Sequence, residues 1–386
     1  MTERIYLDYA ATTPLDKKVL DAMLPYYSEK FGNPSSIHTW GQQADDAVES
    51  ARETIIRLMN AESYTVLFTS GGSESDNLAL RGAAHAARKN RDACHLLISP
   101  VEHPAIAKTA LSLIDEGFEV EWLPVDSNGI VDPKDVITHI RKDTALVSVI
   151  YGNNEIGTIN PVDEISKICT EYGIFFHTDG VQAAAHLRMD FKKNSFAGFS
   201  AGAHKFYGPK GVGILLVSDR SLIEPIQTGG GQEFGMRAGT HNVPGIIGLA
   251  KAYEITCCDM EQNNQHTMLL RDRILTGVMQ SISGTRITGH PKQRLPNHAS
   301  FVFDDVDGNT LLMMLDAGGF ACSSGSACKS GNPKPSDVLI ALGIDKQKSL
   351  GSLRVTLGRN TTADEVQRFL DYLPGVVSKA RKLYAG

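Results

Sequence analysis

The sequence lacks an apolar run long enough to cross a membrane, since no stretch approaches about 18 uncharged apolar residues. It also lacks a surplus of positive charge, with 38 Lys and Arg against 44 Asp and Glu and a net charge of -6. A nucleic-acid partner held by phosphate neutralisation is therefore not expected. No C-x-x-C pair occurs among the six cysteines, which argues against a zinc knuckle, and no secretory signal accompanies them. These absences predict a cytoplasmic protein with reduced thiols and without a membrane partner.

The length and the order of segments predict an α/β protein with two packed domains. At 386 residues the chain exceeds the size at which one hydrophobic core usually stops growing. From about residue 44 to residue 217, short apolar runs alternate with helical stretches, as in parallel strands joined by crossover helices. The strands predicted there are Thr65–Thr69, His95–Ser99, Glu119–Leu123, Leu146–Ile150, Ile174–Thr178 and Gly213–Val217.

Four of these strands end directly in small or polar residues. The turns read T-S-G-G-S-E, S-P-V-E-H-P, Y-G-N-N-E and T-D-G-V-Q. Ligands of open α/β sheets bind at the carboxyl ends of the strands, so we expect the four turns to converge on one site.

A glycine-rich stretch at 228–240 ends this alternation, and a long helix is expected from about 244 to 282. A smaller α/β part follows, in which Ser336 is placed to cap a helix over Asp337–Leu342. Its predicted strands are Ala299–Phe303, Phe320–Ser323 and Leu353–Thr356.

The first turn offers a site for a phosphate group. Its backbone amides and the Ser73 hydroxyl open a predicted helix, and a helix N-terminus attracts anions. No lysine stands at the Walker spacing, so the turn is not a nucleotide loop of that type. Taken alone, a Gly-Gly-Ser turn is more often only a helix cap.

Three further residues suit a cofactor with a charged aromatic ring. Asp179 follows a buried strand and could pair with a pyridinium nitrogen, with Gln182 three residues on within reach of a ring oxygen. Lys205 lies in A-H-K-F-Y-G-P-K-G, between small and aromatic neighbours, where its amine could form a Schiff base. The alternatives are an N-cap aspartate and a solvated surface lysine.

A histidine and a cysteine complete the candidate residues. His103 precedes Pro104 at a strand-to-helix turn, where its flat ring could stack on a cofactor, although a structural histidine is the more common reading. Cys328 lies in A-C-S-S-G-S-A-C-K-S-G-N-P-K-P, a run of small and turn-forming residues that predicts an exposed loop. Only about 3% of an unperturbed thiol is ionised at pH 7, so a nucleophilic role requires local activation.

These segments in this order resemble the cysteine desulfurases of the pyridoxal-phosphate (PLP)-dependent class-V aminotransferase family. The match runs from Y-L-D-Y-A-A-T-T-P near the N-terminus to S-L-R-V-T-L-G-R near the C-terminus. Each motif is weak alone, but the set in register is highly specific. The sequence S-S-G-S-A-C is similar to the loop of the long-loop group, whose members supply sulfur to iron-sulfur cluster assembly.

The resemblance implies the PLP-dependent transferase fold of type I and a homodimer. A large PLP-binding domain over 15–260 would hold a mostly parallel seven-stranded sheet. A small domain over 1–14 and 261–386 would carry the catalytic cysteine loop at about 322–335. The resemblance also implies L-cysteine as the substrate and an iron-sulfur scaffold protein as the sulfur acceptor.

The resemblance assigns roles to individual residues. Lys205 matches the lysine that bonds the cofactor, His103 the stacking histidine, and Cys328 the sulfur acceptor. Arg354, together with Asn154, matches the binding site of the substrate carboxylate, a role that suits the bidentate guanidinium. The other implied cofactor positions are Gly72, Ser73, Asn154, Asp179, Gln182, Gly202, His204 and, from the opposite subunit, Thr240.

The sequence departs from the family pattern at Gly202, where a hydroxyl residue usually binds the cofactor phosphate. The missing charge-assisted bond would contribute about 1.5–3 kcal/mol, enough to weaken cofactor retention without abolishing it. Ser200 is the nearest hydroxyl residue before Gly202 in the sequence. No resident metal is implied, although Cys328 would transiently contact an iron-sulfur cluster on a scaffold.

In the reaction that the resemblance implies, Lys205 removes the Cα proton of the cofactor-bound substrate and the Cys328 thiolate attacks the substrate sulfur. The products are L-alanine and a persulfide on Cys328. Selenocysteine lysis and transamination on the same fold remain alternatives, although a transaminase has no use for the Cys328 thiol. A non-catalytic relative that binds partners is a more remote alternative, because Lys205, Asp179, Arg354 and Cys328 are all retained.

Overall fold

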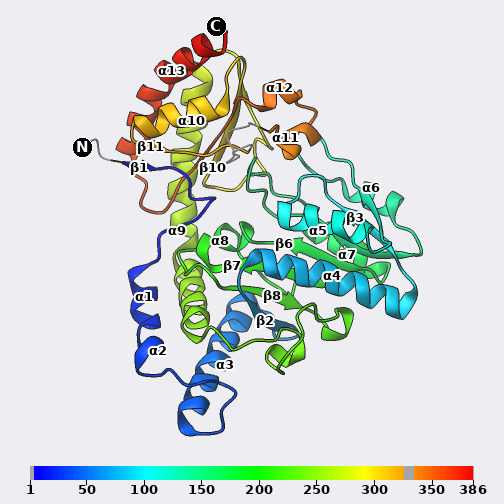
Figure 1. Cartoon of the computed structure of the whole chain (residues 1–386). Coiled ribbons are helices and arrows are strands. Elements are labelled where there is room, and N and C mark those ends of the chain that lie inside the picture. Colours follow the sequence, from blue (N-terminus) through cyan, green and yellow to red (C-terminus); the bar gives the residue numbers. More distant parts are fainter. Residues whose placement is uncertain (1–3, 326–333, 386) are drawn as a thin grey trace.

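The structure is a computed structural model that describes residues 4–325 and 334–385. A seven-stranded sheet forms its larger part, with the strand order β2-β8-β7-β6-β5-β3-β4 (Figure 1). Strand β8 is antiparallel to both of its neighbours, whereas the pairs from β7 to β4 are all parallel. The strands are β2 (Thr65–Thr69), β3 (His95–Ile98), β4 (Glu119–Trp122), β5 (Thr144–Ser148), β6 (Phe175–Asp179), β7 (Gly198–Gly202) and β8 (Gly213–Val217). The predicted α/β fold with a mostly parallel seven-stranded sheet is confirmed.

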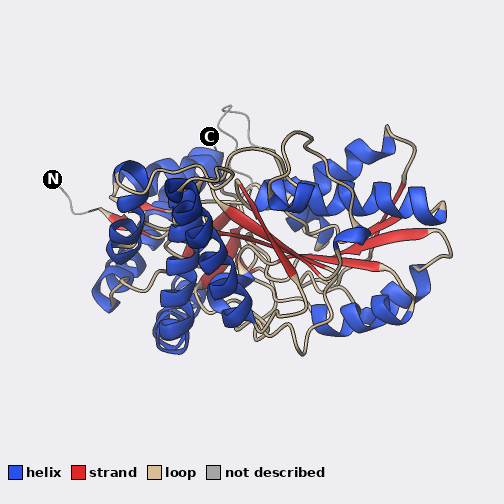
Figure 2. Cartoon of the chain, turned by 90° about the horizontal axis from the view of Figure 1, so that it is seen from below, coloured by secondary structure: helices blue, strands red, loops and turns tan. Residues whose placement is uncertain are grey.

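Helices cover both faces of this sheet (Figure 2). Side chains alternate between the faces of a strand, so a sheet covered twice needs apolar residues at nearly every position. In β2, Val66 and Phe68 lie in the core shared with α3, α7 and α9, whereas Leu67 lies in the core shared with α4 and α5. The helices of this part are α1 (Lys17–Met23), α2 (Pro25–Ser28), α3 (Thr39–Met59), α4 (Gly72–Arg91), α5 (Pro104–Ile114), α6 (Pro133–His139), α7 (Val162–Glu171) and α8 (Ala183–His186).

The smaller part has its own core, to which the N-terminal strand contributes Ile5 and Leu7. Strands β9, β10 and β12 form an antiparallel sheet, and β1 pairs in parallel with β11. The elements are β1 (Ile5–Tyr6), β9 (Thr285–Ile287), β10 (His298–Phe303), α10 (Gly308–Ala317), β11 (Phe320–Ala321), α11 (Asp337–Ala341), α12 (Lys346–Ser349), β12 (Ser352–Thr356) and α13 (Ala363–Ala385).

The long helix α9 (Val243–Ser281) joins the two parts (Figure 1). Its first half contributes Ile246 and Leu249 to the core under the large sheet, and its second half contributes Ile274 and Val278 to the small core. A domain boundary at residue 260 therefore falls inside one continuous helix. The boundaries 15–260, 1–14 and 261–386 stay a prediction, which the separate cores support.

Most predicted elements occur within two residues of their expected bounds, and Ser336 caps α11 by accepting a hydrogen bond from the Leu339 N–H. The missed strand of the large sheet is β7, whose sequence G-F-S-A-G contains little of the β-branched bulk that marks a strand. Its small residues have a packing reason, because a Cβ at Gly198 would lie 2.9 Å from the Phe175 ring.

None of the helices in the described ranges is both long and apolar enough to cross a membrane.

Candidate active site

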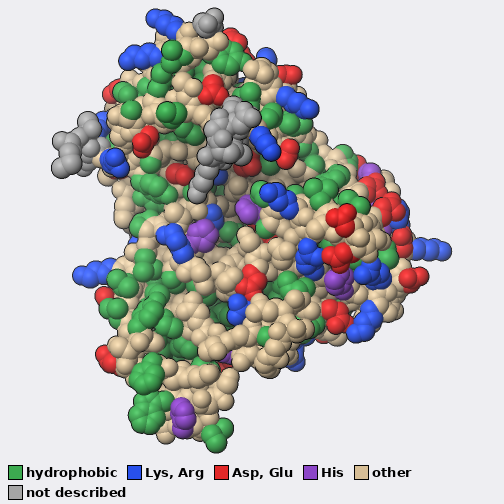
Figure 3. Space-filling view, in the orientation of Figure 1, with side chains coloured by type: hydrophobic (Ala, Val, Ile, Leu, Met, Phe, Trp, Pro, Cys, Tyr) green, Lys and Arg blue, Asp and Glu red, His purple; other side chains and the backbone are tan. Residues whose placement is uncertain are grey.

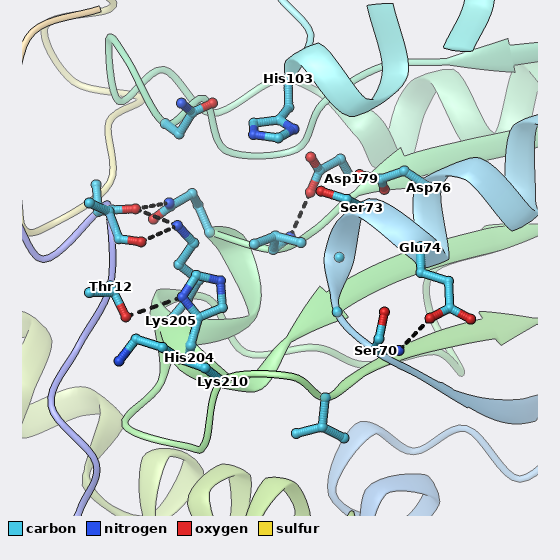
Figure 4. Close-up of a pocket in the computed structure, with 18 of the residues that line it drawn as sticks. Thr12, Ser70, Ser73, Glu74, Asp76, His103, Asp179, His204, Lys205 and Lys210 are labelled. Carbon is cyan, nitrogen blue, oxygen red and sulfur yellow. Dashed lines mark hydrogen bonds between the residues drawn. The ribbon is translucent and has the colours of Figure 1, made fainter. Parts of the chain in front are cut away.

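A cavity of about 640 Å³ lies where the parallel strands of the large sheet end, beside the N-terminal segment. All four predicted turns contribute to its wall, so their expected convergence is confirmed. Histidine, lysine and arginine side chains gather around the corresponding hollow between the two parts of the molecule (Figure 3). The predicted residues that line the cavity are Gly72, Ser73, His103, Asn154, Asp179, Gln182, His204, Lys205 and Arg354. Figure 4 labels five of them: Ser73, His103, Asp179, His204 and Lys205.

The N-terminus of α4 forms one end of the cavity. The backbone N–H groups of Gly72 and Ser73 have no hydrogen-bond acceptor within the described part of the chain. Gly71 precedes them with a φ of 154°, which glycine adopts without strain. Glycine is also required at position 213, because a Cβ there would lie 2.6 Å from the Gly71 backbone. Two free amide donors at a helix N-terminus make this end of the cavity suitable for a phosphate group.

Three ionisable side chains lie close together in the cavity wall. Ligand atoms of Asp76, His103 and Asp179 all lie within 4.8 Å of one another. Burial, reinforced by the nearby Asp179 charge, raises the pKa of Asp76 well above its usual range. Asp179 is also buried, which raises its pKa, but that rise is opposed by His103 where its ring is protonated, by a hydrogen bond from the Val181 N–H and by the Lys205 charge. The pKa of Asp76 is raised the more strongly, so Asp179 ionises before Asp76 and is the better partner for a cationic ring nitrogen.

His103 is both a helix cap and a cavity residue. Its Nδ1 accepts a hydrogen bond of 3.1 Å from the Ala105 N–H at the start of α5, which leaves Nε2 for the cavity. Burial lowers the pKa of His103, so the ring is neutral near pH 7. This histidine therefore has the structural role of a helix cap, and the same hydrogen bond fixes its ring in the cavity wall (Figure 4).

Lys205 ends the short 3-10 helix η1 (Ala203–Lys205), directly after β7. Its Nζ donates hydrogen bonds of 2.6 and 2.8 Å to the carbonyls of Ala10 and Ala11. Burial lowers the pKa of Lys205 to about 8, and the Arg354 charge acts in the same direction. An amine with a lowered pKa is a better nucleophile and base at neutral pH than an ordinary lysine.

Arg354 lies on β12 and reaches the cavity from the smaller part. Its Nη2 is 2.7 Å from Asp8 Oδ1, and its Nη1 donates to the Asn154 carbonyl at 2.9 Å. The Nε atom is buried without a partner in the described residues. These contacts hold the guanidinium at the cavity wall, where it can bind a substrate carboxylate.

Sequence reasoning missed the contribution of the N-terminal segment. Asp8 pairs with Arg354, and the Ala10 carbonyl accepts hydrogen bonds from both Lys205 and Gln182. Thr12 Oγ1 lies 3.3 Å from His204 Nδ1. The motif Y-L-D-Y-A-A-T-T-P signalled the family but gave no indication of these contacts.

A buried hydrogen-bond chain behind Asp179 was also missed. The ring of His177 lies between Ser148 Oγ and Ser200 Oγ, at 3.0 Å from each. Burial lowers the pKa of His177 to about 3, so this ring is neutral. Ser200, which the sequence left without a place, belongs to this buried chain behind the cavity and does not line the cavity itself.

Two predicted residues within the described ranges, Gly202 and Thr240, do not line the cavity. Gly202 lies just behind it, since a Cβ there would be 3.4 Å from the Gly72 nitrogen. Thr240 is exposed and away from this cavity. Cys328 lies outside the described residues, whereas Cys322 follows β11 and packs against the small core. Burial raises the pKa of the Cys322 thiol, which suits a structural cysteine.

Comparisons with known proteins identify the family. The model of the family "Aminotransferase class-V" matches residues 5–369. The chain belongs to the class-V aminotransferase family. It is 45% identical over 380 residues to "Cysteine desulfurase IscS" of Methanosarcina thermophila, covering 98% of this chain and 93% of that protein. It is 39% identical over 380 residues to "Cysteine desulfurase NifS" of Azotobacter vinelandii, covering 98% and 94% of the two chains.

Solved structures of the family agree in fold. A "NIFS-LIKE PROTEIN" matches with a TM-score of 0.90 and 35% identity, covering 97% of this chain and all of that chain. "SspA in complex with cysteine" matches with a TM-score of 0.80 and 32% identity, covering 92% and 99%. The resemblance to cysteine desulfurases that the motifs indicated is thus confirmed.

Members of this family depend on PLP, and the donor set of the cavity fits that cofactor. Free amides at Gly72 and Ser73 suit its phosphate, and the buried Asp179 carboxylate suits its ring nitrogen. The neutral His103 ring suits the face of a flat ring, and Lys205 supplies an amine. The 640 Å³ cavity is within the size range of small-molecule sites.

Proposed function

We propose that this protein is a PLP-dependent cysteine desulfurase that converts L-cysteine to L-alanine and leaves the sulfur as a persulfide on Cys328. The observation that carries the proposal is the meeting of Lys205, Asp179 and Arg354 in one cavity with the free amides of α4. Lys205 supplies the amine, Asp179 a partner for the ring nitrogen, Arg354 a group that binds the substrate carboxylate, and the α4 amides a phosphate site. Full-length cysteine desulfurases at 39–45% identity support the same conclusion.

When bound, PLP supplies an electron sink for the bond that breaks at the substrate Cα. Asp179 would hold the ring nitrogen in its protonated form, while Gln182 would address the neighbouring ring oxygen. Gly72, Ser73 and His204 would bind the phosphate. His103 would cover one face of the ring and exclude water from it.

Substrate handling falls to other side chains. Arg354 would bind the carboxylate of L-cysteine, with Asn154 beside it. Lys205 would remove the proton from Cα, for which its pKa of about 8 is suited. The Cys328 thiolate would then attack the substrate sulfur, forming an S–S bond while the Cβ–S bond breaks. Protonation of the remaining carbon skeleton gives L-alanine.

The decisive test is mass spectrometry of the Cys328 peptide after a limited dose of L-cysteine. We expect one added sulfur on Cys328 and an equal amount of L-alanine, without any keto-acid acceptor. Cys322→Ser serves as the matched control and should retain most activity. Alanine formation without sulfur on Cys328, or a requirement for a keto acid, would reject the proposal. Parallel assays with selenocysteine distinguish a cysteine desulfurase from a lyase that prefers the selenium-containing substrate.

A homodimer is proposed as the working form. Large apolar side chains are exposed at the end of the molecule formed by α1 to α3, including Ile37 at 93%, Phe31 at 66% and Tyr27 at 61% (Figure 3). Such a patch is typical of an interface between subunits. Thr240 is exposed and would reach the phosphate site of the partner subunit. Analytical ultracentrifugation tests this, and an active PLP-loaded monomer would contradict it.

The sulfur acceptor is proposed to be an iron-sulfur scaffold protein, in line with the long-loop resemblance. The experiment is a competition in which labelled persulfide on Cys328 is offered to purified acceptor proteins. Faster transfer to an iron-sulfur scaffold than to a small thiol is expected. Equal transfer to all acceptors would indicate a general sulfur donor instead.

A further inference from the structure

The glycine-rich segment from Gln227 to His241 has an unusual backbone and is held in place by charged side chains. Glu233 and Phe234 adopt positive φ values of 47° and 59°, a region that residues other than glycine rarely occupy. Two consecutive residues keep such a conformation only where surrounding contacts determine it.

Glu233 provides the first set of these contacts. Its carboxylate is 1% exposed and accepts hydrogen bonds of 3.0 Å from both terminal nitrogens of Arg52. It also accepts from the Phe68 N–H at 2.8 Å and lies 2.8 Å from His241 Nε2. Burial opposes its ionisation, but the bonds from His241 and Arg52 outweigh burial and lower the pKa of Glu233. The segment is thereby anchored on α3 and β2.

Arg237 provides a second tie, and this one leads to the phosphate turn. Its Nε lies 2.7 Å from Glu74 Oε1, and its Nη2 lies 3.3 Å from Glu74 Oε2. Glu74 stands in the first turn of α4, and its Oε2 also accepts a hydrogen bond of 2.7 Å from the Ser70 N–H. One carboxylate therefore bridges the glycine-rich segment and the turn that precedes Gly72.

This bridge leaves the turn ready for an anion. Glu74 satisfies the Ser70 N–H, and Thr69 Oγ1 accepts from the Gly71 N–H at 3.3 Å. The next two amides, those of Gly72 and Ser73, are the free donors of the cavity. Glu74 is itself an anion at the start of α4, where the free amides of Gly72 and Ser73 attract negative charge. Its hydrogen bond from the Ser70 N–H holds the carboxylate away from these two amides.

We propose that Arg237 is a positioning residue that acts through Glu74 to hold the turn Ser70–Ser73 in its phosphate-binding conformation. The inference rests on the proposed function, because it assigns that turn to the cofactor phosphate. Arg237 touches neither the cavity nor the reacting atoms. Its effect is on cofactor affinity, through the phosphate alone.

The test measures the dissociation constants of PLP and of pyridoxal, which lacks the phosphate, for the full chain freed of cofactor. Arg237→Met should weaken PLP binding about tenfold, the loss of roughly one charge-assisted bond. Pyridoxal binding should be unchanged. Glu74→Gln, which can still accept from Ser70, should weaken PLP binding less than Glu74→Ala. The control is Arg81→Met, which removes a similarly exposed ion pair to Glu116 elsewhere on α4 and should change neither constant.

A double-mutant cycle tests whether Arg237 acts through Glu74. The variant with both Arg237→Met and Glu74→Ala should bind PLP no more weakly than Glu74→Ala alone. Additive losses, an unchanged PLP constant in Arg237→Met, or an equal loss for pyridoxal would overturn the inference while leaving the proposed function intact. Failure of the unsubstituted chain to bind PLP would reject the proposed function itself.

Discussion

The sharpest consequence of the site geometry concerns the amine of Lys205. Burial lowers its pKa from 10.5 to about 8, with a further contribution from the Arg354 charge, while Asp179 and Asp8 oppose the shift. At pH 7 about 9% of such an amine is uncharged, against about 0.03% for a lysine with the ordinary value. The reactive form is therefore enriched roughly 300-fold at neutral pH.

The measurement is competitive acylation of the cofactor-free protein from pH 6 to pH 10, with the Lys205 peptide quantified by mass spectrometry. The rate should rise about tenfold per pH unit up to pH 8 and level off above it. Arg354→Gln removes a neighbouring positive charge, so the midpoint should move to higher pH. Asp8→Asn removes a negative charge, so the midpoint should move to lower pH.

The same pKa difference has a stability consequence with a definite sign. Between pH 8 and pH 10.5 the unfolded chain binds more protons than the folded chain, so the free energy of unfolding should rise with pH across this window. The full difference corresponds to about 3 kcal/mol, and Lys205→Met should remove the rise. A labelling midpoint near 10, or shifts of the same sign in Arg354→Gln and Asp8→Asn, would refute the electrostatic reasoning.

Three other predictions concern Glu233, Gly202 and Cys328. Glu233→Gln breaks the buried pair with Arg52 and should lower the free energy of unfolding by about 3–5 kcal/mol at pH 7 in urea titrations. The pKa of Glu233 is lowered in the folded state from its ordinary value of 4.5. The difference in unfolding free energy between the unsubstituted protein and Glu233→Gln should therefore shrink as the pH falls below 4.5 and through the lowered pKa. Gly202→Ser should tighten PLP binding about tenfold or more by spectrophotometric titration, because the backbone there is extended and a Cβ has 3.4 Å of space from the Gly72 nitrogen. Cys328→Ser should keep the L-cysteine-induced change in the PLP spectrum but lose the sulfur transfer that accompanies alanine formation. Cys322→Ser should keep both properties. Sulfur transfer by Cys328→Ser would contradict the assignment.

Local pattern was sufficient to predict the parts of the site that follow strands. Residues such as Asp179 and His103 come directly after apolar runs, and the carboxyl ends of parallel strands meet at one edge of a sheet. The prediction failed at β7, where tertiary packing replaces propensity: Gly198 leaves room for the Phe175 ring, and Gly202 lies against the Gly72 backbone. A strand made of small residues carries no local signal of its own.

One missed residue did have a signal. Asp76 begins a helical series with Ala79, Leu80 and Ala83 at spacings of three, four and seven residues, and all four positions are buried. A carboxyl group in line with an apolar stripe indicates burial, and burial of an acid without a cationic partner indicates a raised pKa. The S-E-S-D-N sequence could therefore have indicated a buried acid with a raised pKa in the first turns of α4.

The contacts of the N-terminal segment had no such signal, because they join positions that only the assembled fold brings together. Asp8 bonds Arg354 across 346 residues of sequence, and Gln182 bonds the Ala10 carbonyl across 172. The Ala10 contact uses backbone oxygen, which every residue type offers, so no side-chain pattern could predict it. Its consequence is chemical as well as structural: the Ala10 and Ala11 carbonyls accept from a Lys205 amine whose charge is already disfavoured by burial. Since an ammonium group donates to both carbonyls, these contacts favour the charged form of the amine in the cofactor-free chain.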